Sequence, residues 1–94
     1  MPRSAVRLTI RGRVQGVGYR WWTVETARRL GLDGWVCNRR DGSVEVLAIG
    51  EPAQIERLAE ACRVGPRAAV VTDVERRPAE DDGTIGFDAR GTFE

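Results

Sequence analysis

The sequence predicts an α+β fold in which two helices cover one face of an antiparallel sheet, in the order β-α-β-β-α-β. Three observations support this prediction. Apolar and polar residues alternate in the expected strands, two segments follow the helical period, and Asp41-Gly42 marks a hairpin between the middle strands. This order is the ferredoxin-like split βαβ arrangement, a two-layer sandwich. At 94 residues, the chain is expected to form one domain over 1–94.

The first half of the chain gives clear element boundaries. A strand is predicted over 6–10, where Val, Leu and Ile alternate with Arg and Thr. Three glycines between positions 12 and 18 predict a loop, and a helix is expected over 19–30. Two strands, over 34–38 and 43–49, follow as the hairpin.

The second half is predicted to add a helix and the remaining strands. The helix begins with Pro52, and its apolar face repeats at helical spacing: Ile55, Leu58, Ala59 and Cys62. Residues 69–75 are strand-like, although their alternation slips near Thr72, which indicates a bulge. The short segment 86–90 is either a last strand of its own or part of the preceding strand.

The net charge of +1 conceals an uneven distribution. Residues 1–40 hold nine Arg and two acidic residues, whereas residues 41–94 hold six Arg and twelve acidic residues. This asymmetry predicts either a positive field that attracts a small anion, or halves that interleave so that the charges cancel.

Missing residue types exclude several kinds of chemistry. The chain has no His and no Lys, since all 15 basic residues are Arg. A histidine base, a Schiff-base lysine and a P-loop lysine are therefore excluded. Two cysteines are too few for a disulfide framework, and free thiols favour the cytoplasm. No apolar run reaches membrane length.

The loop over 12–20 is the best candidate for a binding site. It follows a strand and opens a helix, where backbone amides lack intrahelical partners and the helix dipole is positive. Glycines allow several amides to turn toward one ligand, and Arg20 adds a planar fork of donors. The same pattern is also typical of a glycine-rich turn without a ligand.

At this point two motifs resemble those of the acylphosphatase family. The first runs from Gly12 to Arg20 as G-x-V-Q-G-V-x-Y-R, and the second comprises G-W-V-C-N at 34–38, G-S-V-E-V at 42–46 and Gly50. The resemblance covers about residues 6–87. Tyr19, where Phe is commoner, and Cys37, where a longer polar residue is commoner, depart from the family pattern.

The resemblance implies a hydrolase that cleaves the carboxyl–phosphate bond of acyl phosphates without a metal or cofactor. Arg20 would bind the phosphate and Asn38 would orient the attacking water. The phosphate oxygens would also accept hydrogen bonds from the backbone amides of the loop, which belong to Gln15, Gly16, Val17, Gly18, Tyr19 and Arg20. Inorganic phosphate would be both product and inhibitor. Apart from the resemblance, a small domain with no heptad repeat, long apolar edge or membrane-length apolar run is expected to be a monomer without nucleic-acid or membrane partners.

Other residues have ordinary structural interpretations. Trp21, Trp22 and Trp35 are expected to pack in the core or on the sheet, although they could shape the mouth of the site. Glu45 is expected to be a solvated strand residue and Asp41 a turn residue. Both cysteines are expected to be buried and inert.

Two alternatives remain open. Ferredoxin-like sheets can bind RNA through exposed aromatic residues on their central strands, although the first strand shows none here. A non-catalytic domain that binds phosphate or carbamoyl phosphate would use the same loop without turnover. Salt-dependent RNA binding would favour the first alternative, and a single-turnover assay would test the second.

Overall fold

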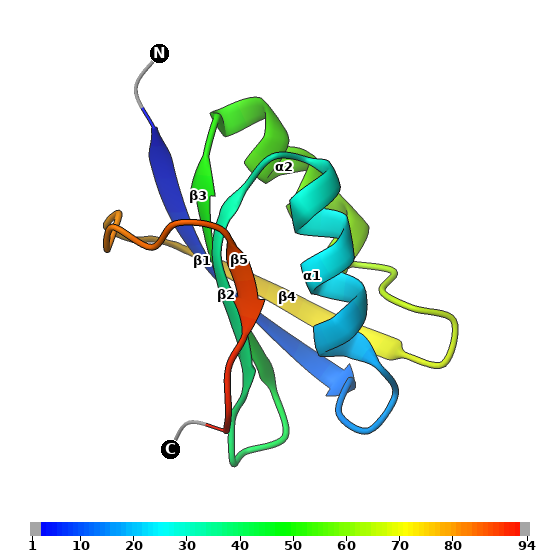
Figure 1. Cartoon of the computed structure of the whole chain (residues 1–94). Coiled ribbons are helices and arrows are strands. Elements are labelled where there is room, and N and C mark those ends of the chain that lie inside the picture. Colours follow the sequence, from blue (N-terminus) through cyan, green and yellow to red (C-terminus); the bar gives the residue numbers. More distant parts are fainter. Residues whose placement is uncertain (1–2, 93–94) are drawn as a thin grey trace.

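The computed structural model describes residues 3–92. Two helices pack side by side on one face of a five-stranded sheet (Figure 1), which is the predicted ferredoxin-like arrangement. The elements, in chain order, are β1 (Ser4–Arg13), α1 (Tyr19–Arg29), β2 (Asp33–Asn38), β3 (Val44–Gly50), α2 (Pro52–Cys62), β4 (Val70–Pro78) and β5 (Phe87–Ala89).

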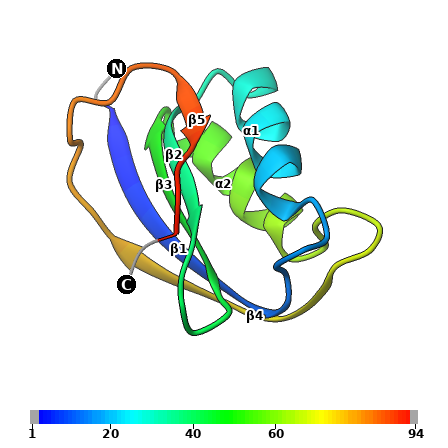
Figure 2. The ribbon, with the colours of Figure 1, turned by 60° about the horizontal axis from the view of Figure 1, so that its bottom comes forward.

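The sheet has the strand order β4-β1-β3-β2-β5. Its pairings are antiparallel except for β5, which runs parallel to β2. Figure 2 shows β5 at the sheet edge beside β2. The tail segment is therefore a strand of its own at the edge opposite β4, and the alternative that counted it with the fourth strand is wrong. The three-residue β5 is also shorter than the predicted strand over 86–90.

The predicted bulge in the fourth strand is confirmed. Along β1, Arg11 pairs with Asp73 but Gly12 pairs with Val71, so that Thr72 has no partner in the register. The extra residue on β4 explains why the alternation of this strand slips in the sequence.

The main core lies between the sheet and the helices. Its fully buried side chains come from both layers and include Leu8, Ile10, Val36, Val44, Val46, Ile55, Leu58 and Phe87. The predicted apolar face of α2 is confirmed, because all four of its residues are buried. Each such aliphatic or aromatic side chain contributes about 1.5–3 kcal/mol when it is removed from water.

The opposite sheet face carries a second, smaller core. Its buried members are Trp35, Cys37, Leu47 and Ile49. The segment between β4 and β5 contributes to its cover, since Ala79 packs against this cluster and Asp82 accepts a hydrogen bond from Nε1 of Trp35 at 3.3 Å. The guanidinium groups of Arg7 and Arg90 lie 5.5 and 5.1 Å from the centroid of the Trp35 ring.

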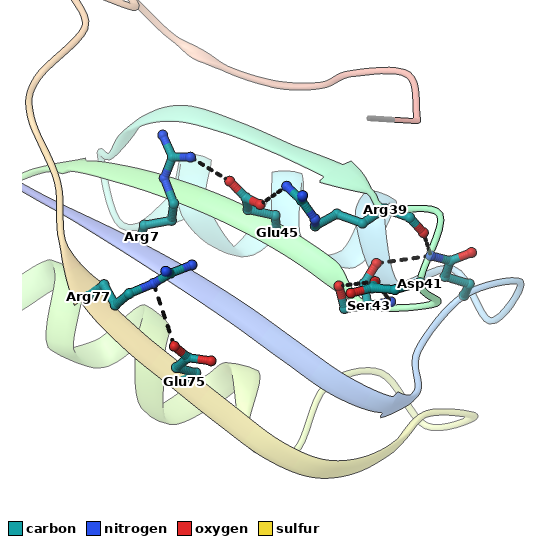
Figure 3. Close-up of polar contacts among 8 residues, drawn as sticks. Arg7, Arg39, Asp41, Ser43, Glu45, Glu75 and Arg77 are labelled. Carbon is teal, nitrogen blue, oxygen red and sulfur yellow. Dashed lines mark hydrogen bonds and ion pairs between the residues drawn. The ribbon is translucent and has the colours of Figure 1, made fainter. Parts of the chain in front are cut away.

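Glu45 on the same face is not a solvated residue, so its sequence interpretation is wrong. Only 3% of its side chain is exposed, and its carboxylate accepts hydrogen bonds from Arg7 and Arg39 (Figure 3). The Arg7 contact measures 2.7 Å. A buried carboxylate is stable only when it is paired with a positive charge. Here Arg7 of β1 and Arg39, just after β2, provide the pairing.

Ion pairs join the basic first part of the chain to the acidic second part. Arg11 pairs with Asp73 and Glu75, and Arg28 pairs with Asp88. The interleaving of charges that the sequence left open is therefore realised in the sheet. In the described part of the chain, neither helix has the length and apolar character needed to cross a membrane.

Candidate active site at the β1–α1 loop

The loop between β1 and α1, the end of β2 and β5 surround one pocket of about 390 Å³. The pocket is lined by Val14, Gly16, Gly18, Tyr19, Arg20, Trp21, Asn38 and Ala89. The strand order explains this meeting, because β5 lies beside β2 and α1 contacts both strands. Both motifs of the sequence thus contribute to a single cavity, although 17 residues lie between Arg20 and Asn38 in the chain.

Two glycines give the loop its shape. Gly16 and Gly18 have φ values of 73° and 80°, in the left-handed region that side chains disfavour. A Cβ at either position would meet no atom within 4 Å, so the backbone conformation requires glycine here and crowding does not. The open space beside both residues is part of the pocket, which lets a ligand approach the main chain.

The main-chain amides of this loop are available to a ligand. Within residues 3–92, no hydrogen bond uses the amide of any residue from Gln15 to Arg20 as its donor. Gly18 is the N-cap of α1 and supplies no side-chain cap, so the positive end of the helix dipole is also uncompensated there. Free amides beside a cationic side chain are suited to binding an oxyanion.

Arg20 lies in the first turn of α1 and is half-buried. Its Nη1 donates a hydrogen bond of 3.0 Å to the main-chain carbonyl of Arg90, just beyond β5. Arg90 is itself held in place, since its amide donates to the carbonyl of Val36 at 2.8 Å. None of the ion pairs found in residues 3–92 involves Arg20, so a carboxylate does not compete with an incoming anion.

Asn38 is the last residue of β2 and pairs with Val44 of β3 in the sheet register. Its half-buried carboxamide lines the pocket, and no described residue forms a hydrogen bond with it. The turn that follows is fixed independently of Asn38. Asp41 accepts hydrogen bonds from the amide and hydroxyl of Ser43 at 2.9 and 2.6 Å (Figure 3), which confirms Asp41 as a turn residue.

The side chain of Gln15 connects the loop to this turn, a role that the sequence analysis did not identify. Its Nε2 donates to the carbonyls of Arg39 and Ser43, at 2.7 and 2.9 Å. Because both partners are acceptors, the nitrogen of the amide must face them. The two bonds hold the glycine loop against the chain that follows Asn38. No local pattern signals them, since Gln15 and Ser43 are 28 positions apart.

We expect Gln15→Met to lower kcat/KM for a substrate of this pocket by about tenfold, because loosening the loop misplaces the groups on either side of the pocket. Both carbonyls retain main-chain donors, Gly42 and Arg39, so the free energy of unfolding should fall by only about 1 kcal/mol. Steady-state kinetics and urea unfolding measure the two effects. Gln54→Met on α2 is the matched control, and equal activity of the two variants would contradict the positioning role.

The titratable groups nearest the pocket are unsuited to acid–base or nucleophilic work. Burial, together with the nearby Cys62 and the bond to it, raises the pKa of the Tyr19 phenol far above its usual range. Its hydroxyl donates to the carbonyl of Cys62 at 2.6 Å, which gives the departure from Phe a structural role. Burial raises the pKa of the Cys62 thiol to about 12 and also raises the pKa of Cys37. Neither thiol is a ready nucleophile near neutral pH.

Metal-binding side chains are not grouped in the described part of the molecule. Residues 3–92 contain no set of three or more His, Cys, Asp or Glu side chains placed to hold a metal ion. The polar groups that line the pocket are instead amides, a guanidinium and a carboxamide, which suit an oxyanion.

The fold and pocket thus define a small α+β domain whose strand-to-helix loop lines a pocket suited to an oxyanion. Comparison with known proteins agrees with this class. A family model described as acylphosphatase matches residues 6–89. An acylphosphatase of Acidiphilium cryptum (strain JF-5) is 50% identical over 88 residues, which cover 94% of this chain and 97% of that relative.

Two solved structures are similar to the whole domain. An acylphosphatase from Coxiella burnetii aligns with a TM-score of 0.90 at 34% identity, over 94% of this chain and 93% of the other. An acylphosphatase from Bacillus subtilis aligns with a TM-score of 0.88 at 36% identity, over 92% and 97%. The chain therefore belongs to the acylphosphatase family, which makes it a hydrolase.

Proposed function

We propose that this protein hydrolyses acyl phosphates to a carboxylate and inorganic phosphate at the pocket beside the β1–α1 loop. One observation carries the proposal: Arg20, Asn38 and a loop with unpartnered amides line the same cavity. The arginine and the amides would hold the phosphoryl oxygens, and the carboxamide would face the water that attacks phosphorus. Membership of the acylphosphatase family supports this reaction over simple phosphate binding.

Each part of the reaction matches a property of these residues. Water oxygen forms a bond to phosphorus, and the bond between phosphorus and the acyl oxygen breaks with its electron pair on the carboxylate. This leaving group is a weak base, with a pKa of about 4 to 5 as in side-chain carboxyls, so it departs without a general acid. Phosphoryl transfer then depends mainly on positioning and charge stabilisation.

The water proton would pass to a phosphate oxygen of the substrate. Asn38 cannot accept a proton at neutral pH, and the chain has no histidine. The arginine and amides therefore stabilise the charge that develops on the phosphoryl oxygens, while Asn38 orients the water. Any ionisation in the pH profile near neutrality should belong to the substrate phosphate.

The direct test is hydrolysis of benzoyl phosphate by the purified chain. We expect turnover that persists in EDTA and is inhibited competitively by inorganic phosphate, because the proposed binding groups are a guanidinium and main-chain amides. Release of phosphate and benzoate in equal amounts would be followed continuously. Binding of phosphate without hydrolysis, even in a single-turnover experiment, would instead identify a non-catalytic binding domain.

The RNA-binding alternative receives little support from the open face of the sheet. Trp35 on this face is only 4% exposed and is hydrogen-bonded by Asp82. Arg7 and Arg11 of β1 are both engaged in ion pairs with acidic side chains. Among residues 3–92, a base would find no exposed aromatic ring to stack on at this face.

The proposed state of the protein is a monomer in the cytoplasm. Both cysteines are buried and free, which suits a reducing compartment. The large hydrophobic side chains that are exposed come from four separate segments of the chain: Trp21, Val64, Val70 and Ile85. Sedimentation of the purified chain would test the monomer.

A further inference from the structure

The three tryptophans of the chain have very different environments. Trp35 is buried in the second core with its Nε1 hydrogen-bonded. Trp22 packs partly against the main core, and its ring meets that of Tyr19 edge-on with centroids 5.3 Å apart. Trp21 is 66% exposed, and no described residue forms a hydrogen bond with its indole. The expectation that all three tryptophans pack is thus wrong for Trp21.

Exposure by itself does not mark a site, because single apolar residues are common on protein surfaces. Val64, Val70 and Ile85 are also exposed, but none of them lines the pocket. Trp21 differs because it is a lining residue of the pocket that holds Arg20 and Asn38. Its position explains this, since side chains in an α-helix lean toward the N-terminus and Trp21 lies in the first turn of α1.

The pocket has room for more than the phosphoryl group. Its volume of about 390 Å³ lies within the usual range of about 300–1,000 Å³ for sites that hold small molecules. A phosphoryl group held by the loop amides and Arg20 leaves the acyl part of the substrate outside the loop. Of the apolar residues that line the pocket, Val14 and Tyr19 are almost fully buried, so Trp21 offers the large exposed apolar surface there.

We propose that Trp21 binds the acyl group of the substrate and makes the enzyme select acyl phosphates with a flat, apolar acyl group. This inference rests on the proposed function of the pocket. The indole offers a large apolar face beside the phosphate site, against which an aromatic or extended acyl group stacks. An acetyl group is too small to cover this face and gains little from it.

The charged groups of the pocket also indicate what charge the preferred acyl group carries. Among the lining residues that the structure describes, Arg20 is the one charged side chain, and it is assigned to the phosphate. Within residues 3–92 the lining therefore offers neither a carboxylate for a cationic acyl group nor a second cation for an anionic one. The preferred acyl group is therefore uncharged as well as apolar.

The test compares benzoyl phosphate with acetyl phosphate for wild type, Trp21→Ala and Trp21→Phe. We expect Trp21→Ala to lower kcat/KM for benzoyl phosphate by about fivefold to tenfold, the usual effect of one aromatic pair, and to change that for acetyl phosphate by less than about twofold. Trp21→Phe, which keeps a ring, should recover most of the preference. Ile85→Ala, an exposed apolar residue outside the pocket, is the matched control.

A binding measurement separates this inference from the proposed function. Benzylphosphonate and methylphosphonate resist hydrolysis, and calorimetry gives their dissociation constants directly. We expect Trp21→Ala to weaken only benzylphosphonate. An unchanged ratio between the two phosphonates, or an equal loss for both acyl phosphates, would overturn the role of Trp21 while leaving the hydrolase intact. Wild type that binds both phosphonates but turns over neither acyl phosphate would instead contradict the proposed reaction.

Discussion

Arg20→Ala should lower kcat/KM for benzoyl phosphate by about 10³-fold or more. One donor to a developing oxyanion is worth about 10²–10³ in rate, and Arg20 provides a charge as well as a fork of donors. Inorganic phosphate should also lose most of its inhibitory effect, because the same guanidinium would bind it in the product complex. Initial-rate kinetics with phosphate as inhibitor measures both losses.

The fold should survive this substitution. The single hydrogen bond of Arg20 to the carbonyl of Arg90 contributes about 1 kcal/mol, and circular dichroism with thermal unfolding would show a small effect. Arg29→Ala is the matched control, since this arginine lies exposed in the last turn of the same helix. Arg20→Lys keeps the charge but loses the fork, and it should recover only part of the activity. Full activity of the Arg20→Ala variant would contradict the proposal that Arg20 binds the phosphate.

Asn38→Ala should lower kcat by about 10²-fold and change the inhibition constant of phosphate by less than about threefold. The carboxamide is proposed to orient the water in the transition state, whereas the phosphate is held by other groups. Since the carboxamide of Asn38 forms no hydrogen bond with a described residue and its main chain stays in the ladder with β3, its truncation should leave the hairpin intact. Kinetics at saturating substrate, together with phosphate inhibition, measures the two quantities separately.

The chain has no second asparagine to serve as a control, so phosphate binding by the same variant takes that place. Equal losses of kcat and phosphate affinity would indicate that Asn38 binds the phosphoryl group instead of the water. Unchanged kcat would end its assignment to the water altogether. Asn38→Asp adds a useful comparison, because a carboxylate of the same size would repel the phosphate dianion and weaken its inhibition.

Most of the fold could be predicted from local patterns. The alternation in β1 follows a repeat of two residues, and the spacing of Ile55 and Leu58 follows the helical repeat of 3.6. These repeats and the Asp-Gly turn can be recognised from a few neighbouring residues. Even the bulge at Thr72 was visible as a slip of that repeat. The position of β5 in the sheet could not be predicted from the sequence, because the pairing of Phe87 with Gly34 joins residues far apart in the chain.

The candidate site was predicted less completely than the fold. The loop and Arg20 follow from the chemistry of a glycine-rich helix start, and Asn38 came only from the family resemblance. The side-chain bonds of Gln15 and the burial of Glu45 were missed, and the place of Trp21 at the pocket was only the less favoured alternative to packing. These contacts and exposures depend on which segments surround the residue in the folded protein, and the spacing of residues in the sequence does not reveal those segments.

The sequence by itself determined the element order, the turn chemistry and the absence of a histidine base, and it predicted that the loop binds an oxyanion. Those properties depend on residue types and on interactions within a few positions. Only the tertiary structure decided that β5 closes the sheet beside β2, and that Arg20, Trp21 and Asn38 share one pocket. Glu45 is likewise a buried carboxylate whose pair with Arg39 lies within one hairpin but whose pair with Arg7 depends on β1 lying beside β3 in the sheet. The physical reason is that packing brings distant segments together, and burial and charge pairing are properties of that arrangement.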